Sequence, residues 1–176
     1  GTGAPGVVAD VAVRAGKVVA IGSSVGPAAH TVDAAGLALA PGIIDTHTHY
    51  DAQITWDPGC TPSPELGVTS VLIGNCGFTI APCREPDRDL IMKNLVQVEG
   101  MSLDVLRGGI KWDFETFPQY LDMLEAQGSV MNVGAFLGHS SIRTYVMGAA
   151  ATERAANDDE ISEMADLVRA GMKAGA

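Results

Sequence analysis

Two histidines lie two positions apart directly after a short apolar run. The segment PGIIDTHTHYD, residues 41–51, contains His47 and His49, and the whole chain has only four histidines. In an extended strand, side chains two positions apart point to the same face. Two imidazoles on one face can bind one divalent metal ion. The competing interpretation is an incidental pair of surface histidines at the end of a strand.

Two further ligand-capable residues follow apolar runs that we predict to be buried strands. The run VTSVLIGNC (68–76) ends in Cys76, and VMNVGAFLGH (130–139) ends in His139. If these strands are parallel, their carboxyl ends meet at one edge, where functional groups gather in α/β barrels. Imidazole and thiolate are both good zinc ligands. A bound divalent cation lowers the pKa of its water towards ~7 and polarises a carbonyl, so this pattern predicts metal-assisted hydrolysis.

Each of these residues also has a plainer interpretation. A cysteine such as Cys76 is often a small buried hydrophobe. His139 could be a hydrogen-bonded structural histidine or could contact a substrate. Asp51 could orient the histidines from behind, or it could cap a loop. Arg143 could bind a substrate carboxylate, or it could be a solvated surface arginine.

The elements that must position these residues alternate along the chain. We expect a β-hairpin over residues 7–22 around a turn at Ala15–Gly16, followed by a further strand at Thr31–Asp33. Buried strands are expected at 42–47, 68–76 and 130–139, and helices at 61–67, 86–98, 117–126, 140–148 and 158–174. Apolar strands separated by helices predict a parallel sheet covered on both faces, either an α/β barrel or a doubly wound sheet.

The last predicted helix, 158–174, has the clearest pattern. Asp158 is the expected N-cap. Its apolar residues recur with helical spacing on one face, which we expect to face the core: Ile161, Met164, Ala165, Val168 and Met172.

Composition sets the outer limits. The chain has 176 residues, 47% of them apolar and 18% charged, which suffices for an ordinary globular domain. A net charge of −10 argues against nucleic-acid or anionic-membrane partners. The sequence has no apolar run long enough for a membrane span and no signal-peptide pattern at its N-terminus. The three cysteines do not suggest a disulfide framework, so we expect a reducing cytoplasm.

Three stretches of the sequence resemble a known family. DVAVRAGKVVAIG and VDAAGLALAPGIIDTHTHYD resemble the opening of the amidohydrolase superfamily, and GVTSVLIGNCGFTIAP (67–82) is similar to its N-acyl-D-amino-acid deacylase group. The resemblance implies an α/β fold. Residues 1–40 would be the N-terminal part of a small β-sandwich, and 41–176 the first three βα units of a truncated, distorted TIM barrel.

The resemblance also implies a site and a reaction. His47, His49 and Cys76 would bind one or two divalent ions, most simply Zn²⁺. From the residues themselves, His139, Asp51 and Arg143 stay candidates for contact with substrate or support of the ligands. The expected catalytic aspartate would lie beyond residue 176, so these residues alone would be an inactive N-terminal fragment of a longer enzyme, which could be an oligomer.

The reaction implied is hydrolysis of a linear amide in a small-molecule N-acyl-D-amino acid. Two alternatives stay open at this point. One is a cyclic-amide hydrolase of the dihydroorotase or hydantoinase kind. The other is a non-catalytic homologue that serves as a binding or assembly module.

Overall fold

The computed structural model describes residues 3–176, apart from the side chain of Glu99. The chain separates into two compact units, Gly1–Pro41 and Gly42–Ala176. The first contains strands β1 (Asp10–Arg14) and β2 (Lys17–Gly22), which pair antiparallel. This confirms the predicted hairpin, and its turn residues Ala15 and Gly16 both have positive φ.

The prediction of a strand at Thr31–Asp33 is wrong. In the described part of the first unit β1 and β2 pair only with each other, and residues 31–33 form no strand. A β-strand is defined by backbone pairing, so an extended segment with no strand beside it remains irregular. Val32 is accordingly 85% exposed.

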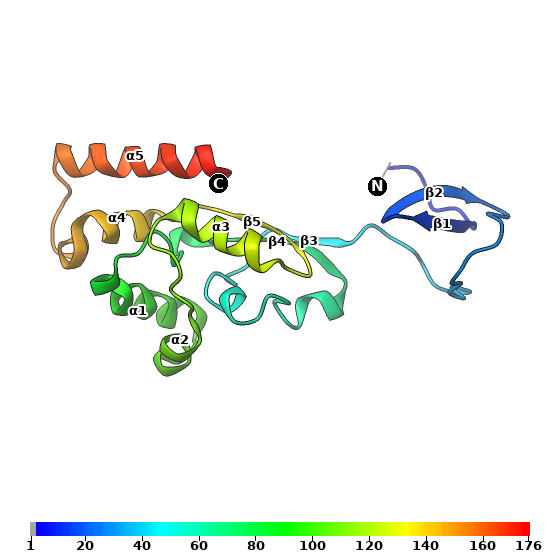
Figure 1. The fold of residues 1–176 in the computed structure, drawn as a ribbon, viewed down its shortest axis with the longest axis horizontal. Coiled ribbons are helices and arrows are strands. Elements are labelled where there is room, and N and C mark those ends of the chain that lie inside the picture. The colour runs from blue at the N-terminus through cyan, green and yellow to red at the C-terminus, as the bar shows by residue number, and fades with distance from the viewer. Residues whose placement is uncertain (1–2) are drawn as a thin grey trace. The chain divides into compact units, whose positions relative to one another are not determined.

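The second unit is built on a parallel sheet (Figure 1). Strands β3 (Ile43–Asp45), β4 (Val68–Ile73) and β5 (Asn132–Ala135) lie in the order β3-β4-β5, and both pairings are parallel. This confirms the α/β class expected from apolar strands separated by helices. In the central strand, Val71 and Ile73 lie two positions apart on one face and are completely buried, whereas Ile43 and Ile44 of β3 are 55% and 63% exposed. Among the described residues the sheet is therefore fully buried only on part of one face, and the predicted burial of all three strands with cover on both faces is wrong.

Helices connect and flank the strands. They are α1 (Arg88–Glu99), α2 (Leu103–Gly109), α3 (Phe117–Gln127), α4 (His139–Met147) and α5 (Asp158–Ala174). The predictions for α1, α3, α4 and α5 are confirmed to within two residues, whereas α2 was not predicted. The expected helix at 61–67 is a short 3₁₀ helix, Ser63–Leu66. No helix in the described range is long and apolar enough to cross a bilayer.

The bounds of α5 are as predicted, but its cap and its buried face are not. Asn157, rather than Asp158, is the N-cap, and its side chain accepts a hydrogen bond from the Glu160 amide. The expected core stripe is largely exposed: Ile161, Val168 and Met172 are 53%, 42% and 62% accessible. The helix instead packs through Gly171, where an added Cβ would lie 2.4 Å from Leu137. A small residue allows this close backbone approach, which a periodicity argument overlooks.

Candidate metal centre

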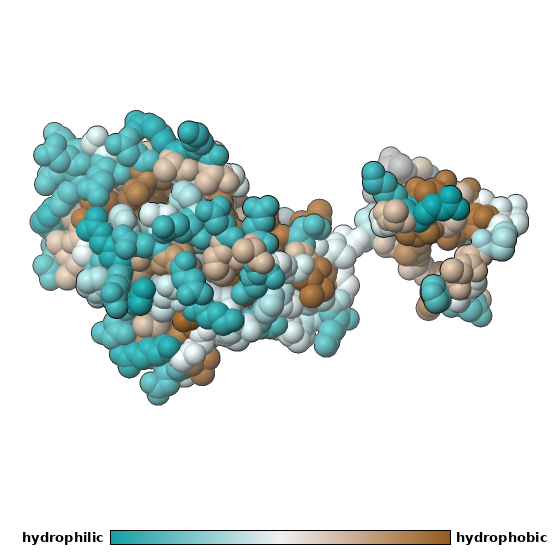
Figure 2. Space-filling view, in the orientation of Figure 1, coloured by the Kyte–Doolittle hydropathy of each residue, from teal (hydrophilic) through white to brown (hydrophobic). Residues whose placement is uncertain are grey.

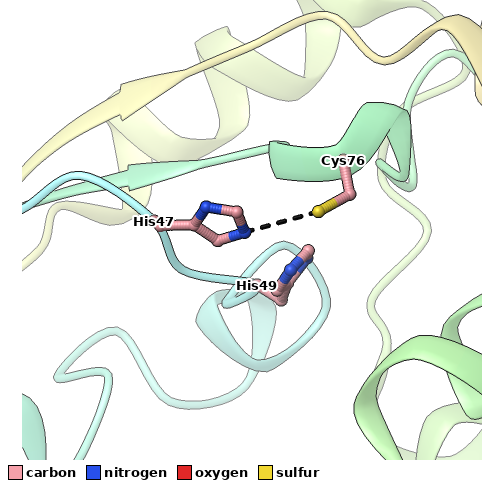
Figure 3. Close-up of side chains that lie close together, drawn as sticks. All are labelled: His47, His49 and Cys76. Carbon is pink, nitrogen blue, oxygen red and sulfur yellow. Dashed lines mark hydrogen bonds between the residues drawn. The ribbon is translucent and has the colours of Figure 1, made fainter.

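The two histidines lie just beyond the end of β3. The strand ends at Asp45, whose carboxylate accepts a hydrogen bond from the His47 amide at 3.1 Å. Thr48 is buried, and both its amide (3.1 Å) and its hydroxyl (2.8 Å) donate to the carbonyl of Leu72. Thr48 is thus anchored on β4, while His47 and His49 project towards Cys76 (Figure 3). The alternation of side chains therefore continues past the strand.

Cys76 lies in a tight turn that follows β4 rather than at the strand's last position. The strand ends at Ile73, and Asn75–Gly77 form a short 3₁₀ helix. Gly74 and Gly77 have φ angles of 82° and 79°, and Cys76 itself has a φ of 57°. A positive φ is unusual for a residue with a side chain, and such outliers gather at functional sites. This conformation turns the thiol back towards the histidines.

The structure brings together the three residues predicted as metal ligands. Cys76 Sγ lies 3.3 Å from His47 Nε2, and the two imidazole rings meet edge-on with centroids 5.4 Å apart. One potential ligand atom from each of His47, His49 and Cys76 lies within 4.8 Å of the others. Atoms this close to one another can surround a single ion.

The chemistry of these donors fits a divalent ion of intermediate softness. Burial, and then the neighbouring His47, lower the pKa of His49, which favours its neutral, metal-binding form. His47 and Cys76 are exposed, so an ion or a substrate can reach them from solvent. Two imidazole nitrogens and one thiolate match the preferences of zinc.

The other two cysteines do not share this environment. Cys60 and Cys83 are both free and completely or almost completely buried. Burial raises the pKa of Cys60 to about 11 and that of Cys83 to about 12. Both therefore remain protonated thiols in the core.

Asp51 and His139 lie close to the Cys76 turn. Asp51 is buried, and its Oδ2 accepts a hydrogen bond from the amide of Gly74 at 2.9 Å. β5 ends at Ala135, so His139 does not end that strand but begins α4, where it is exposed. A Cβ added to Gly77 would lie 3.8 Å from the amide nitrogen of His139, so the start of α4 borders the turn.

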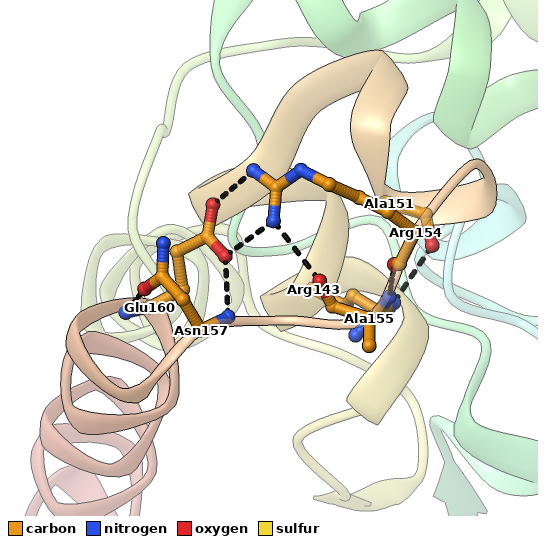
Figure 4. Close-up of polar contacts among 6 residues, drawn as sticks. All are labelled: Arg143, Ala151, Arg154, Ala155, Asn157 and Glu160. Atoms are coloured by element: carbon orange, nitrogen blue, oxygen red, sulfur yellow. Dashed lines mark hydrogen bonds and ion pairs between the residues drawn. The ribbon is translucent and has the colours of Figure 1, made fainter.

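Arg143 is bound to the backbone of the connection between α4 and α5 (Figure 4). Its guanidinium donates to the carbonyl oxygens of Ala151 (2.7 Å) and Arg154 (2.5 Å). These bonds give the side chain a structural task. Its predicted contact with substrate gains no support from them.

Two residues that shape the site were not singled out from the sequence. The Thr48 hydroxyl ties the histidine segment to β4 at the Leu72 carbonyl, and Asn75 ties the Cys76 turn to that segment by donating to the Thr48 carbonyl. For Thr48 a signal existed, because a residue between two outward-facing histidines must face inward. Nothing in the sequence pattern marks Asn75, since its role depends on the conformation of the turn.

Comparison with known proteins places this chain in a family. A model described as the amidohydrolase family matches residues 30–176. The chain therefore belongs to the amidohydrolase family. The D-aminoacylase of Alcaligenes xylosoxydans xylosoxydans is 40% identical over 177 aligned positions, which cover 100% of this chain and 34% of that protein.

Solved structures give the same result. A structure of D-aminoacylase, studied for the role of its binuclear metal center, matches with a TM-score of 0.79 and 35% identity, covering 99% of this chain and 34% of its own. N-acyl-D-glutamate deacylase from Bordetella bronchiseptica, solved with zinc and a phosphonate inhibitor, matches with a TM-score of 0.76 and 32% identity. The match covers 98% of this chain and 34% of that protein. The chain thus spans about a third of the length of these relatives.

Proposed function

We propose that the chain forms part of a metal-dependent hydrolase that cleaves the linear amide of small N-acyl-D-amino acids. The convergence of Cys76 with His47 and His49 carries this proposal. It is supported by the amidohydrolase family membership and by D-aminoacylase being similar over the whole chain. That whole-chain similarity favours a linear amide over the cyclic-amide and non-catalytic alternatives.

His47, His49 and Cys76 would hold the cation, and we propose zinc because the donors are nitrogen and sulfur. When bound, such a cation supplies Lewis-acid chemistry towards an acyl carbonyl and a water molecule. Cys76 contributes the anionic donor of the set, and the neutral form of His49 is favoured by burial. The three residues thus provide a site that could hold one ion, or contribute to holding two.

The proton-transfer group is proposed to lie outside residues 1–176. Within these residues, the buried carboxylate of Asp51 already accepts a hydrogen bond from the Gly74 amide, which suits a structural task. The family resemblance implies a catalytic aspartate elsewhere. His139, exposed beside the Cys76 turn, is our candidate for substrate contact.

The proposal extends to the architecture and the compartment. We propose that residues 41–176 are the first three βα units of a distorted TIM barrel, which the parallel order β3-β4-β5 supports. Residues 1–40 would be part of a small β-sandwich, which the exposed apolar hairpin supports. The three free cysteines support a reducing, cytoplasmic location.

The proposal is tested by measuring the metal content and the substrate hydrolysis of the full-length protein that contains these residues. Wild type, Cys76→Ala and the control Cys83→Ala would be analysed for bound metal and assayed on N-acetyl-D- and N-acetyl-L-amino acids. We expect about one zinc ion per chain to be lost with Cys76, together with hydrolysis of the D-substrates. Cys83→Ala removes a buried thiol outside the cluster and should retain both properties.

Full zinc occupancy in Cys76→Ala would overturn the assignment of the site. Turnover of cyclic amides in preference to N-acetyl-D-amino acids would overturn the substrate class while leaving the site in place.

A further inference from the structure

The two segments that carry the candidate ligands are joined by hydrogen bonds from residues that are not themselves ligands. Asn75 Nδ2 donates to the carbonyls of Thr48 (3.1 Å) and Leu72 (2.8 Å). Asp51 Oδ2 accepts from the Gly74 amide at 2.9 Å. The bond to Thr48 and the bond between Asp51 and Gly74 cross from the histidine segment to the Cys76 turn, while the bond to Leu72 fixes Asn75 within the turn itself. The spacing between thiol and imidazoles therefore depends on groups outside the cluster.

We propose that Asp51 is a positioning residue for Cys76, a role that rests on the proposed metal site. Asp51 follows His49 by two positions, and Gly74 precedes Cys76 by two. The single bond between Asp51 and Gly74 thus closes a short path from one ligand to another. One interpretation of the sequence was that this carboxylate orients the histidines; its bond to the Gly74 amide also fixes the entry to the cysteine turn.

Asp51 is held rigidly enough to act in this way. The residue is 1% exposed, and its own carbonyl accepts a hydrogen bond from the Tyr120 hydroxyl at 2.9 Å. Tyr120 is completely enclosed, and burial, followed by Asp51 and Cys60, raises its pKa well above the ordinary value, so it remains a donor. A carboxylate bonded to a buried amide is among the stronger hydrogen bonds of a protein.

The turn has little freedom to compensate for loss of this bond. A Cβ at Gly74 would lie 2.4 Å from the carbonyl oxygen of Phe136, so the turn packs directly against the chain that follows β5. Rotation of the Gly74 peptide would redirect the chain that leads to Cys76. The thiol would then no longer meet the imidazoles at ligand distance.

The test uses Co²⁺ as the metal probe in the full chain. Wild type, Asp51→Ala and Asp51→Asn would be titrated while the thiolate-to-cobalt charge-transfer band is followed, and affinity would be measured by chelator competition. In the metal-free proteins, hydrogen exchange of the Gly74 amide provides a second readout. The control is Asp57→Ala, because Asp57 accepts bonds from the Gly59 and Thr61 amides inside its own loop.

We expect Asp51→Ala to bind Co²⁺ about 10–100-fold more weakly and to exchange the Gly74 amide faster. Asp51→Asn keeps an acceptor for that amide and should stay within a few-fold of wild type. Asp57→Ala should match wild type in both measurements.

The proposal would be overturned if Asp51→Ala kept the Co²⁺ affinity and the Gly74 exchange rate of wild type. It would also be overturned if Asp51→Asn lost as much Co²⁺ affinity as Asp51→Ala, because the charge of Asp51 rather than its hydrogen bond would then matter. If Asp51→Ala does not fold, Tyr120→Phe carries the test. It removes only the hydroxyl that anchors Asp51 and should shift both readouts in the same direction, whereas no shift in either would reject the role. If wild type shows no thiolate band, the metal site itself fails, while Gly74 exchange still reports on the bond.

Discussion

At the scale of single residues, the site depends on the backbone of the Cys76 turn. Among the described residues other than glycine, only Ala15, Cys60 and Cys76 have a positive φ. Ala15 lies in the hairpin turn, where that conformation is ordinary. At Cys76 it costs about 1–3 kcal/mol and is retained where it aims the thiol at His47. The strain is thus part of how the site is built.

A substitution at Gly74 measures how tightly the Cys76 turn is packed. In Gly74→Ala the new Cβ would meet the Phe136 carbonyl at 2.4 Å. We expect the free energy of unfolding to fall by the usual left-handed cost of about 1–2 kcal/mol. A further loss of about 1–3 kcal/mol should come from the clash. Urea denaturation measures both.

The matched control is Gly100→Ala. Gly100 has a φ of 66°, close to that of Gly74, but among the described residues no atom beyond its chain neighbours lies within 4 Å of its added Cβ. It should show the left-handed cost alone, and equal losses in the two variants would mean that the turn is not tightly packed against Phe136.

Chemistry-bearing residues could be selected from the sequence because their identity carries information. His47, His49 and Cys76 are unusual residue types at the ends of apolar runs, and the structure gathers them. The bonds of Thr48, Asn75 and Asp51 could not be foreseen with the same precision. They depend on a turn whose path is set by packing against Phe136 and Gly138, which are distant in sequence.

At the scale of elements, helix bounds followed from local signals and buried faces did not. Thr116 and Gln119 form a capping box that starts α3, and Asn157 and Glu160 do the same for α5. Such caps involve neighbours in sequence, so local signals place a helix start to within a residue, although the N-cap of α5 is Asn157 and not the predicted Asp158. The face of α5 that packs depends on Leu137, which belongs to another part of the chain. The short helix α2 has too little periodicity to be recognised.

The start of α5 should respond to pH through Glu160. A hydrogen bond from Arg154, then one from the Asn157 amide, lowers the pKa of Glu160 from 4.5 to about 2. A carboxyl with a lowered pKa stabilises the fold fully above its ordinary pKa and loses that contribution as the pH falls towards the lowered one. Glu160→Gln should therefore reduce the urea midpoint most at pH 7 and progressively less below about pH 4.5.

Glutamine can still form the capping box, so this comparison isolates the charge. Glu153→Gln, which changes an exposed acid just before the helix, serves as the control. A pH-independent difference between wild type and Glu160→Gln would show that the ion pair with Arg154 contributes nothing.

Arg143 should contribute to stability rather than to substrate binding. Arg143→Leu removes charged hydrogen bonds to the Ala151 and Arg154 carbonyls and should lower the free energy of unfolding by about 1–3 kcal/mol. Metal content and KM for N-acetyl-D-amino acids should not change. Arg169→Leu disrupts only an exposed pair with Asp166 and should be nearly neutral. A marked rise in KM for Arg143→Leu at unchanged stability would restore the substrate contact suggested by the sequence.

At the scale of the whole molecule, the described surface has much apolar area. In the first unit Val8, Val32, Leu37 and Leu39 are 108%, 85%, 74% and 77% exposed, and Figure 2 shows apolar residues gathered on that unit. In the second unit Ile44 on strand β3 is 63% exposed. Isolated two-stranded hairpins are at best marginally stable, and large apolar patches mark surfaces that bind something.

We therefore expect a polypeptide of residues 1–176 alone to self-associate. Size-exclusion chromatography with light scattering should find species larger than a monomer, and the dye ANS should bind strongly. A double variant, Val13→Thr with Val18→Thr, replaces a cross-strand pair that is 63% and 58% exposed while keeping β-branched side chains. The double variant should self-associate less and bind less ANS, because it lowers the exposed apolar area while the hairpin stays folded. A monomeric wild-type polypeptide that binds no dye at the same concentration would show that these side chains find cover within the 176 residues.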